Sequence, residues 1–99
     1  MKLAILVCSS YFVDRAMDMM TASGIDYYTR LDGAKGKGHG TEARLGTSVF
    51  GRTNSVLMIA FQDDAPREQL IRRIELENQR IERRSDHIRL FQIPLEMIV

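Results

Sequence analysis

The glycines of this 99-residue chain are concentrated in one stretch. Residues 33–51 read GAKGKGHGTEARLGTSVFG and hold six of the seven glycines, with three basic residues, a histidine and no proline. Glycine loses more conformational freedom on folding than any other residue, so this cluster does not suit a packed helix or strand. It suits a loop whose backbone adopts unusual dihedrals or approaches a ligand closely. We therefore expect function in this glycine window and a scaffold in the rest.

Length and composition predict one soluble domain, residues 1–99, because 44% of the chain is hydrophobic and 27% is charged. The longest apolar run, residues 3–8, is far too short to cross a bilayer, and the N-terminus lacks the pattern of a secretory signal. We expect a cytoplasmic protein. A net charge of +1 argues against a nucleic-acid-binding protein, whose domain is usually strongly basic. Cys8 ends the apolar run and is expected to be a buried, unreactive thiol.

Four segments have the patterns of β-strands. Residues 2–8 and 55–61 are continuously apolar after their first residues, Lys2 and Ser55, which suits strands buried on both faces. Residues 27–31 are rich in aromatic and β-branched side chains. Residues 88–93 give the last strand, which Pro94 is expected to end.

Two further segments predict helices. The hydroxyls of Ser9 and Ser10 can cap a first helix, which should stop at Gly24. The carboxylates of Asp63 and Asp64 can cap a second helix, with a proline in its first turn. The residues expected to face inward are Val13, Ala16, Met17 and Met20 in the first helix and Leu70, Ile71, Ile74 and Ile81 in the second.

The order strand, helix, strand, glycine window, strand, helix, strand predicts an α+β fold, the ferredoxin-like βαββαβ sandwich. Its four-stranded antiparallel sheet has two helices on one face and a long glycine-rich loop between the second and third strands. Because residues 3–8 and 56–61 are apolar at both alternating sets of positions, the other face would be an exposed hydrophobic patch in a monomer. We expect an oligomer that packs sheet against sheet, in which the apolar residues 95–99 add a strand or seal the contact.

This pattern resembles the PII family of nitrogen-regulatory signalling proteins. The letters KGH at 37–39, followed by TE at 41–42 and then Gly46, are similar to the stretch that opens the long T-loop of PII proteins. Residues 55–61 are placed like the strand that returns from that loop. The resemblance implies a homotrimer with its sheets facing inward and a flexible T-loop-like segment at about residues 33–54.

In PII proteins the ligand is an adenine nucleotide, bound in clefts between subunits. The resemblance places Lys35, Gly36, Lys37 and Gly38 at the base of the T-loop, and Arg89 where the family has a phosphate-contacting lysine. It implies that these residues hold ATP, ADP or another adenine nucleotide as a small-molecule effector, because backbone amides and cations together bind polyphosphates. It also implies a regulated partner protein, either an enzyme or a transporter in a membrane.

The chain departs from the family pattern in two places. The family has a glycine-rich loop before the last strand, whereas residues 82–87 read ERRSDH with no glycine. Bulky side chains there are expected to narrow or reshape the phosphate pocket. No tyrosine lies between Gly33 and Asn54, so the tyrosine nucleotidylation of some PII proteins has no acceptor here. We expect a divergent PII-like protein.

A second hypothesis is a metal-binding protein similar to the CutA group, which shares the trimeric fold and is linked to metal tolerance. Its ligands would be His39, His87 or Glu42, with Asp86 beside His87 as a further donor. These residues lack the close pairing typical of recognisable metal sites. The sequence has no readable catalytic triad and no phosphate loop ending in Gly-Lys-Ser/Thr, so we expect no enzymatic activity.

Overall fold

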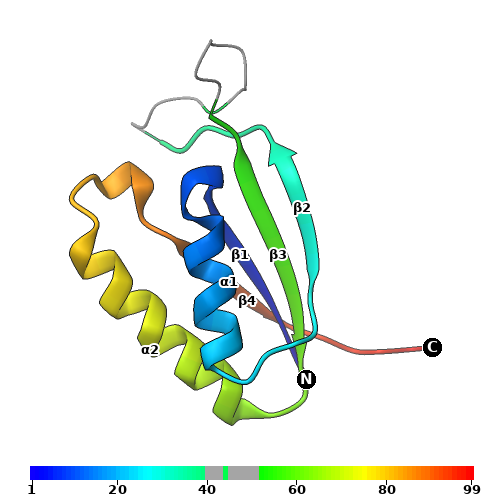
Figure 1. Cartoon of the computed structure of the whole chain (residues 1–99). Coiled ribbons are helices and arrows are strands. Elements are labelled where there is room, and N and C mark those ends of the chain that lie inside the picture. The colour runs from blue at the N-terminus through cyan, green and yellow to red at the C-terminus, as the bar shows by residue number, and fades with distance from the viewer. Residues whose placement is uncertain (40–43, 45–51) are drawn as a thin grey trace.

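The computed structural model describes residues 1–39, 44 and 52–99. The strands and helices follow one another in the predicted order (Figure 1). The strands are β1 (Lys2–Ser9), β2 (Thr29–Ala34), β3 (Asn54–Phe61) and β4 (Arg89–Pro94), and the helices are α1 (Val13–Ala22) and α2 (Asp64–Arg80). A short 3₁₀ turn, Ser10–Phe12, precedes α1, and a second one, Arg84–Asp86, precedes β4. Within the described residues, no helix has both the length and the apolar character needed to cross a membrane.

The sheet has the antiparallel order β2-β3-β1-β4, which places the two continuously apolar strands at its centre. Both helices lie on the same side of this sheet (Figure 1). The predicted ferredoxin-like α+β fold is therefore confirmed. Side chains alternate between the two faces, and the row formed by Leu6, Leu57 and Leu90 points toward the helices.

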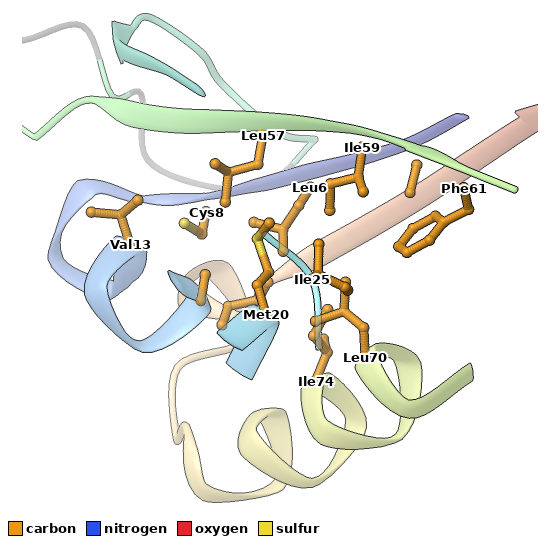
Figure 2. Close-up of a cluster of buried hydrophobic side chains, with 13 residues drawn as sticks. Leu6, Cys8, Val13, Met20, Ile25, Leu57, Ile59, Phe61, Leu70 and Ile74 are labelled. Atoms are coloured by element: carbon orange, nitrogen blue, oxygen red, sulfur yellow. The ribbon is translucent and has the colours of Figure 1, made fainter. Parts of the chain in front are cut away.

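The hydrophobic core lies between the sheet and the two helices (Figure 2). Leu6 and Leu57 from the central strands are fully buried, and they pack with Met20 from α1 and Leu70 from α2. The buried residues of the helices repeat every three or four positions, as the sequence predicts. Met17 and Ile71 were also expected to face inward, but both are half-buried and lie at the margins of their helix stripes.

Cys8 is 1% exposed, which confirms the prediction of a buried thiol. Burial raises the pKa of this thiol to about 11 from its ordinary 9.0, and the nearby Arg44 and Arg30 only partly offset the rise. The folded protein holds the thiol proton more tightly than the unfolded chain does. The stability that Cys8 contributes is therefore complete below about pH 9 and is lost as the pH rises through about 11.

We expect native Cys8 to resist thiol reagents at pH 8 and to react at once in denaturant, because the protonated, buried sulfur is a poor nucleophile. Between pH 8 and pH 10.5, the unfolding free energy should fall more for the natural protein than for Cys8→Ala, by up to about 2 kcal/mol. Urea titrations of both proteins at the two pH values measure this difference. Reaction of the native protein at the rate of a free thiol would contradict the assignment.

The second strand differs from its prediction. It spans Thr29–Ala34 rather than residues 27–31, because Tyr27 packs edge-on against Phe61, with ring centroids 6.1 Å apart, before pairing begins. The strand then continues into the glycine window through an irregularity between Leu31 and Ala34, where Gly33 has a φ of +72°. Only glycine adopts such a φ readily, and this explains the first glycine of the window.

The helix starts also differ from expectation. Ser9 Oγ accepts a hydrogen bond from the Tyr11 amide at 3.4 Å, so it caps the 3₁₀ turn, and α1 begins only afterwards. Asp63 makes no capping hydrogen bond, and Asp64 instead accepts one from Arg67 Nη2 at 2.9 Å. Half of the predicted T-loop-like segment, residues 40–43 and 45–51, lies outside the described residues, so its flexibility stays a prediction.

Candidate anion-binding site

A cleft of about 500 Å³ opens where β2 runs into the glycine window and β4 begins. One wall comes from the window, with Lys35, Gly36, Lys37, Gly38, His39 and Arg44. The opposite wall comes from Ser85, His87 and Arg89, and the floor includes Val7, Asn54, Val56 and Phe91. All five residues that the resemblance assigns to ligand binding therefore lie around one cavity, although Arg89 is far from the others in sequence.

The charge of this cleft is strongly one-sided. Lys35, Lys37, Arg44 and Arg89 are cations, and none of the described lining residues is a carboxylate. Lys37 Nζ donates to the Gly38 carbonyl at 3.2 Å, and Arg89 Nη2 donates to the Arg84 carbonyl at 3.4 Å, so both side chains are held by weak, exposed contacts. A concave site with clustered cations attracts anions and suits a flexible polyphosphate.

The backbone of Gly36 fixes one wall of the cleft. Gly36 and Arg44 form an antiparallel bridge, with N–O distances of 2.9 Å from Gly36 to Arg44 and 2.6 Å in the reverse direction. A Cβ at position 36 would lie 2.7 Å from Asn54 Nδ2. A larger residue here would force the Asn54 side chain to shift, so glycine is favoured by this close approach rather than by a positive φ.

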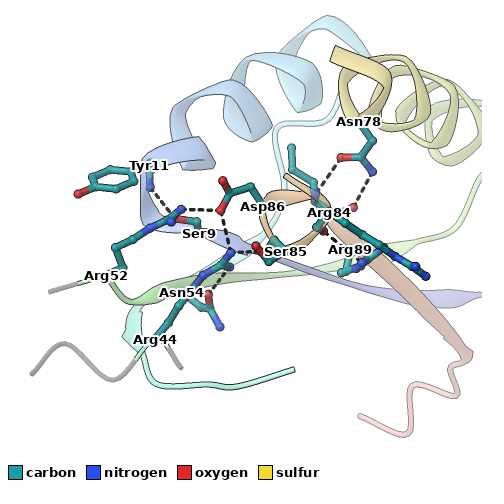
Figure 3. A network of polar contacts seen from close by, with 11 residues as sticks. Ser9, Tyr11, Arg44, Arg52, Asn54, Asn78, Arg84, Ser85, Asp86 and Arg89 are labelled. Atoms are coloured by element: carbon teal, nitrogen blue, oxygen red, sulfur yellow. Dashed lines mark hydrogen bonds and ion pairs between the residues drawn. The ribbon is translucent and has the colours of Figure 1, made fainter. Parts of the chain in front are cut away.

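Asp86, a buried carboxylate next to the cleft-lining Ser85, is the centre of a network of polar contacts (Figure 3). Asp86 Oδ1 accepts hydrogen bonds from Arg52 Nη2 at 2.7 Å and from Arg44 Nη2 at 3.1 Å. Arg44 Nη2 also donates to the Ser85 carbonyl, and Arg44 Nη1 donates to Asn54 Oδ1 at 3.0 Å. These bonds connect the glycine window, β3 and the Arg84–Asp86 turn.

The second arginine of this cluster has its own support. Arg52 Nη2 donates to Ser9 Oγ at 2.9 Å, and its guanidinium carbon lies 4.8 Å from the centre of the Tyr11 ring. Two guanidinium groups thus share the single carboxylate of Asp86. Burial lowers the pKa of Arg44, the charge of Arg52 lowers it further, and Asp86 raises it. The two arginines and one aspartate leave the cluster with one excess positive charge. Arg44 is the arginine of this cluster that lines the cleft.

Sequence patterns did not indicate this cluster. Residues 82–87 were expected to form a bulky wall, but Asp86 turns inward while Arg84 stays exposed. The pairing of Arg44 with Asp86 joins residues 42 positions apart, for which the sequence carries no local signal. The metal hypothesis pairs Asp86 with His87 as donors, but Asp86 is bonded to two arginines and His87 Nε2 lies 3.0 Å from the Ile81 carbonyl.

The structure gives the metal hypothesis little support. His39 lines the cleft, His87 contacts a carbonyl, and Asp86 is held by arginines. Glu42 lies outside the described residues. Across residues 1–39, 44 and 52–99, no three histidine, cysteine or acidic side chains are gathered closely enough to hold a metal ion.

Comparison with known proteins finds likeness in structure and none in sequence, since neither a family model nor a curated protein matches the chain. CPII, a nitrogen regulatory PII-like protein from Thiomonas intermedia K12, matches in two structures. One, bound to ADP, AMP and bicarbonate, has a TM-score of 0.68 at 17% identity, and the other, bound to ADP and bicarbonate, has 0.66 at 14%. Each match covers 93% of this chain and 84% of CPII.

TTHA0516 from Thermus thermophilus, described as a PII-like signalling protein, has a TM-score of 0.55 at 17% identity. That match covers 93% of this chain and 81% of the other. Identities this low establish shared architecture and no more. The resemblance predicted from the sequence is confirmed at that level: the chain has the fold of the PII-like proteins.

Proposed function

We propose that this chain is a non-enzymatic PII-like signalling protein that binds an adenine nucleotide in the cationic cleft and regulates a partner protein through its glycine window. The observation that carries the proposal is that Lys35, Gly36, Lys37, Gly38 and Arg89 line one cleft whose described residues include no carboxylate. ADP and AMP in the structures of CPII support the choice of ligand.

The cleft suits a nucleotide because it combines two chemistries. Its cations and the amides of the glycine wall suit phosphate oxygens. Val7, Val56 and Phe91 give it an apolar floor, and an aromatic or aliphatic surface suits the face of a base. We assign the phosphates to the Lys35–Arg89 side and the base to this floor.

The same floor connects ligand binding to assembly. By strand register, Val7, Val56 and Phe91 lie on the sheet face opposite the helices. Phe91 is 57% exposed there, and Leu31 and Ile93 are about half exposed. A homotrimer packed through this face would cover it and would place the cleft between subunits. We therefore propose a homotrimer with one nucleotide in each intersubunit cleft, which the apolar residues 95–99 help to seal.

The regulated partner in this proposal is a cytoplasmic enzyme or a membrane transporter. Nucleotide binding at the base of the window would select one arrangement of that segment, and the partner would recognise the arrangement. A link to nitrogen regulation belongs to the same proposal.

Isothermal titration of the natural protein with ATP, ADP, AMP and cyclic AMP tests the proposal. We expect heat and a rise in melting temperature with at least one of them. Arg89→Gln should weaken binding of that nucleotide by at least about tenfold, because it removes a cation that can form two hydrogen bonds with phosphate. Arg72→Gln is the matched control, since Arg72 is exposed on α2 and does not line the cleft.

The control should bind as the natural protein does. Absence of heat and of any thermal shift with all four nucleotides would refute nucleotide binding. Equal weakening in Arg72→Gln and Arg89→Gln would show a general effect of charge and remove the assignment of Arg89.

A further inference from the structure

Arg44 touches both walls of the cleft. Its backbone pairs with Gly36 on the window side, and its guanidinium donates to the Ser85 carbonyl and to Asp86 on the opposite side (Figure 3). A third bond, to Asn54 on β3, holds the guanidinium from below. One residue therefore joins the two walls of the cleft.

This guanidinium also has unused binding capacity. It carries five N–H donors, and the bonds to Asn54, Ser85 and Asp86 use three of them. The other two have no acceptor among the described residues. Because the Arg44 side chain is 14% exposed and that of Asp86 is 11% exposed, the pair lies in surroundings that screen charge weakly. An anion entering the cleft would meet a cation that is already ordered.

We infer that Arg44 is a further phosphate-binding residue of the cleft and that Asp86 is its positioning residue. This inference rests on the proposed nucleotide function and adds to it how the site is regulated. Phosphate in the cleft and the Arg44–Asp86 pair strengthen each other, since the anion balances the surplus positive charge and Asp86 holds the guanidinium in place. Binding is thereby coupled to the contact between residue 44 and the Arg84–Asp86 turn.

Arg52 makes the inference testable, because it is a second arginine on the same carboxylate oxygen that does not line the cleft. Arg44→Met and Arg52→Met each remove one guanidinium from Asp86 and leave it the other. Both should lower the melting temperature. Only Arg44→Met should raise the Kd for ADP by about tenfold or more, whereas Arg52→Met should change it by less than about threefold.

The positioning role has a separate readout. Asp86→Asn keeps the size of the side chain and its acceptor oxygen but removes the charge, so the cleft becomes more positive. Simple electrostatics then predicts tighter ADP binding. If Asp86 positions Arg44, ADP should bind about fivefold more weakly, and AMP, with one phosphate fewer, should lose less.

The results of these titrations separate three claims: the role of Arg44, the role of Asp86 and the proposed function. Binding of ADP by Arg44→Met at natural strength, or equal weakening by Arg44→Met and Arg52→Met, would overturn the role of Arg44 and leave the proposed function intact. Tighter binding by Asp86→Asn would overturn the positioning role. If the natural protein binds none of ATP, ADP, AMP and cyclic AMP, the proposed function and this inference fail together.

Discussion

The Phe91→Glu variant is expected to be monomeric and to bind ADP at least about 100-fold more weakly than the natural protein, since a buried, unpaired carboxylate costs several kcal/mol. Phe91 is 57% exposed on the sheet face that the helices leave open, and it also lines the cleft. A glutamate there would place a charge in the proposed subunit contact and would also put a carboxylate on the apolar floor assigned to the base.

Sedimentation velocity at micromolar concentration and calorimetry with ADP measure the two effects. Leu76→Glu is the control: Leu76 is 62% exposed, similar to Phe91, but it lies on α2, on the helical side. This control should keep both assembly and affinity. A natural protein that sediments as a monomer, or a Phe91→Glu variant that stays assembled, would contradict packing through the open sheet face.

The second large effect concerns the core. Leu6→Ala should lower the free energy of unfolding by about 3–5 kcal/mol, through lost hydrophobic transfer and the cavity left behind. Leu6 is fully buried and stands between Leu57 and Leu90 in the sheet, so strands on both sides limit how far the site can collapse. A loss of this size is a large fraction of the stability of a domain this small.

Urea denaturation of the natural protein and of Leu6→Ala measures this loss of unfolding free energy. Leu76→Ala removes the same atoms from an exposed position and should cost less than about 0.5 kcal/mol. A loss below about 1 kcal/mol for Leu6→Ala would show that Leu6 is not at the centre of the core.

The strands β1 and β3 could be predicted closely because their signal is local. Each is a continuous apolar run, and each occupies a central place in the sheet. The second strand was displaced because its limits depend on tertiary contacts: Tyr27 packs on Phe61, and Gly33 allows the chain to continue past Leu31. Neither the packing of Tyr27 nor the irregularity at Gly33 has a signature in the sequence around it.

Only some residues of the cleft could be predicted, because only some of them belong to a local sequence motif. Lys35 to Gly38 stand out as a glycine-rich, basic motif, and Arg89 entered only through the resemblance to PII proteins. Arg44 and Asp86 have no motif at all. Their pairing depends on the inward direction of the Arg84–Asp86 turn, which the sequence ERRSDH does not reveal because charged residues usually face water.

The bridge between Gly36 and Arg44 changes how the glycine window can be altered by design. Because residue 44 is anchored to the Arg84–Asp86 turn, the chain between Gly36 and Asn54 consists of two short spans with a fixed point between them. Ordering a short span costs less entropy than ordering one long loop. Under the proposed function, grafts on either side of residue 44 would therefore vary partner recognition and nucleotide affinity separately.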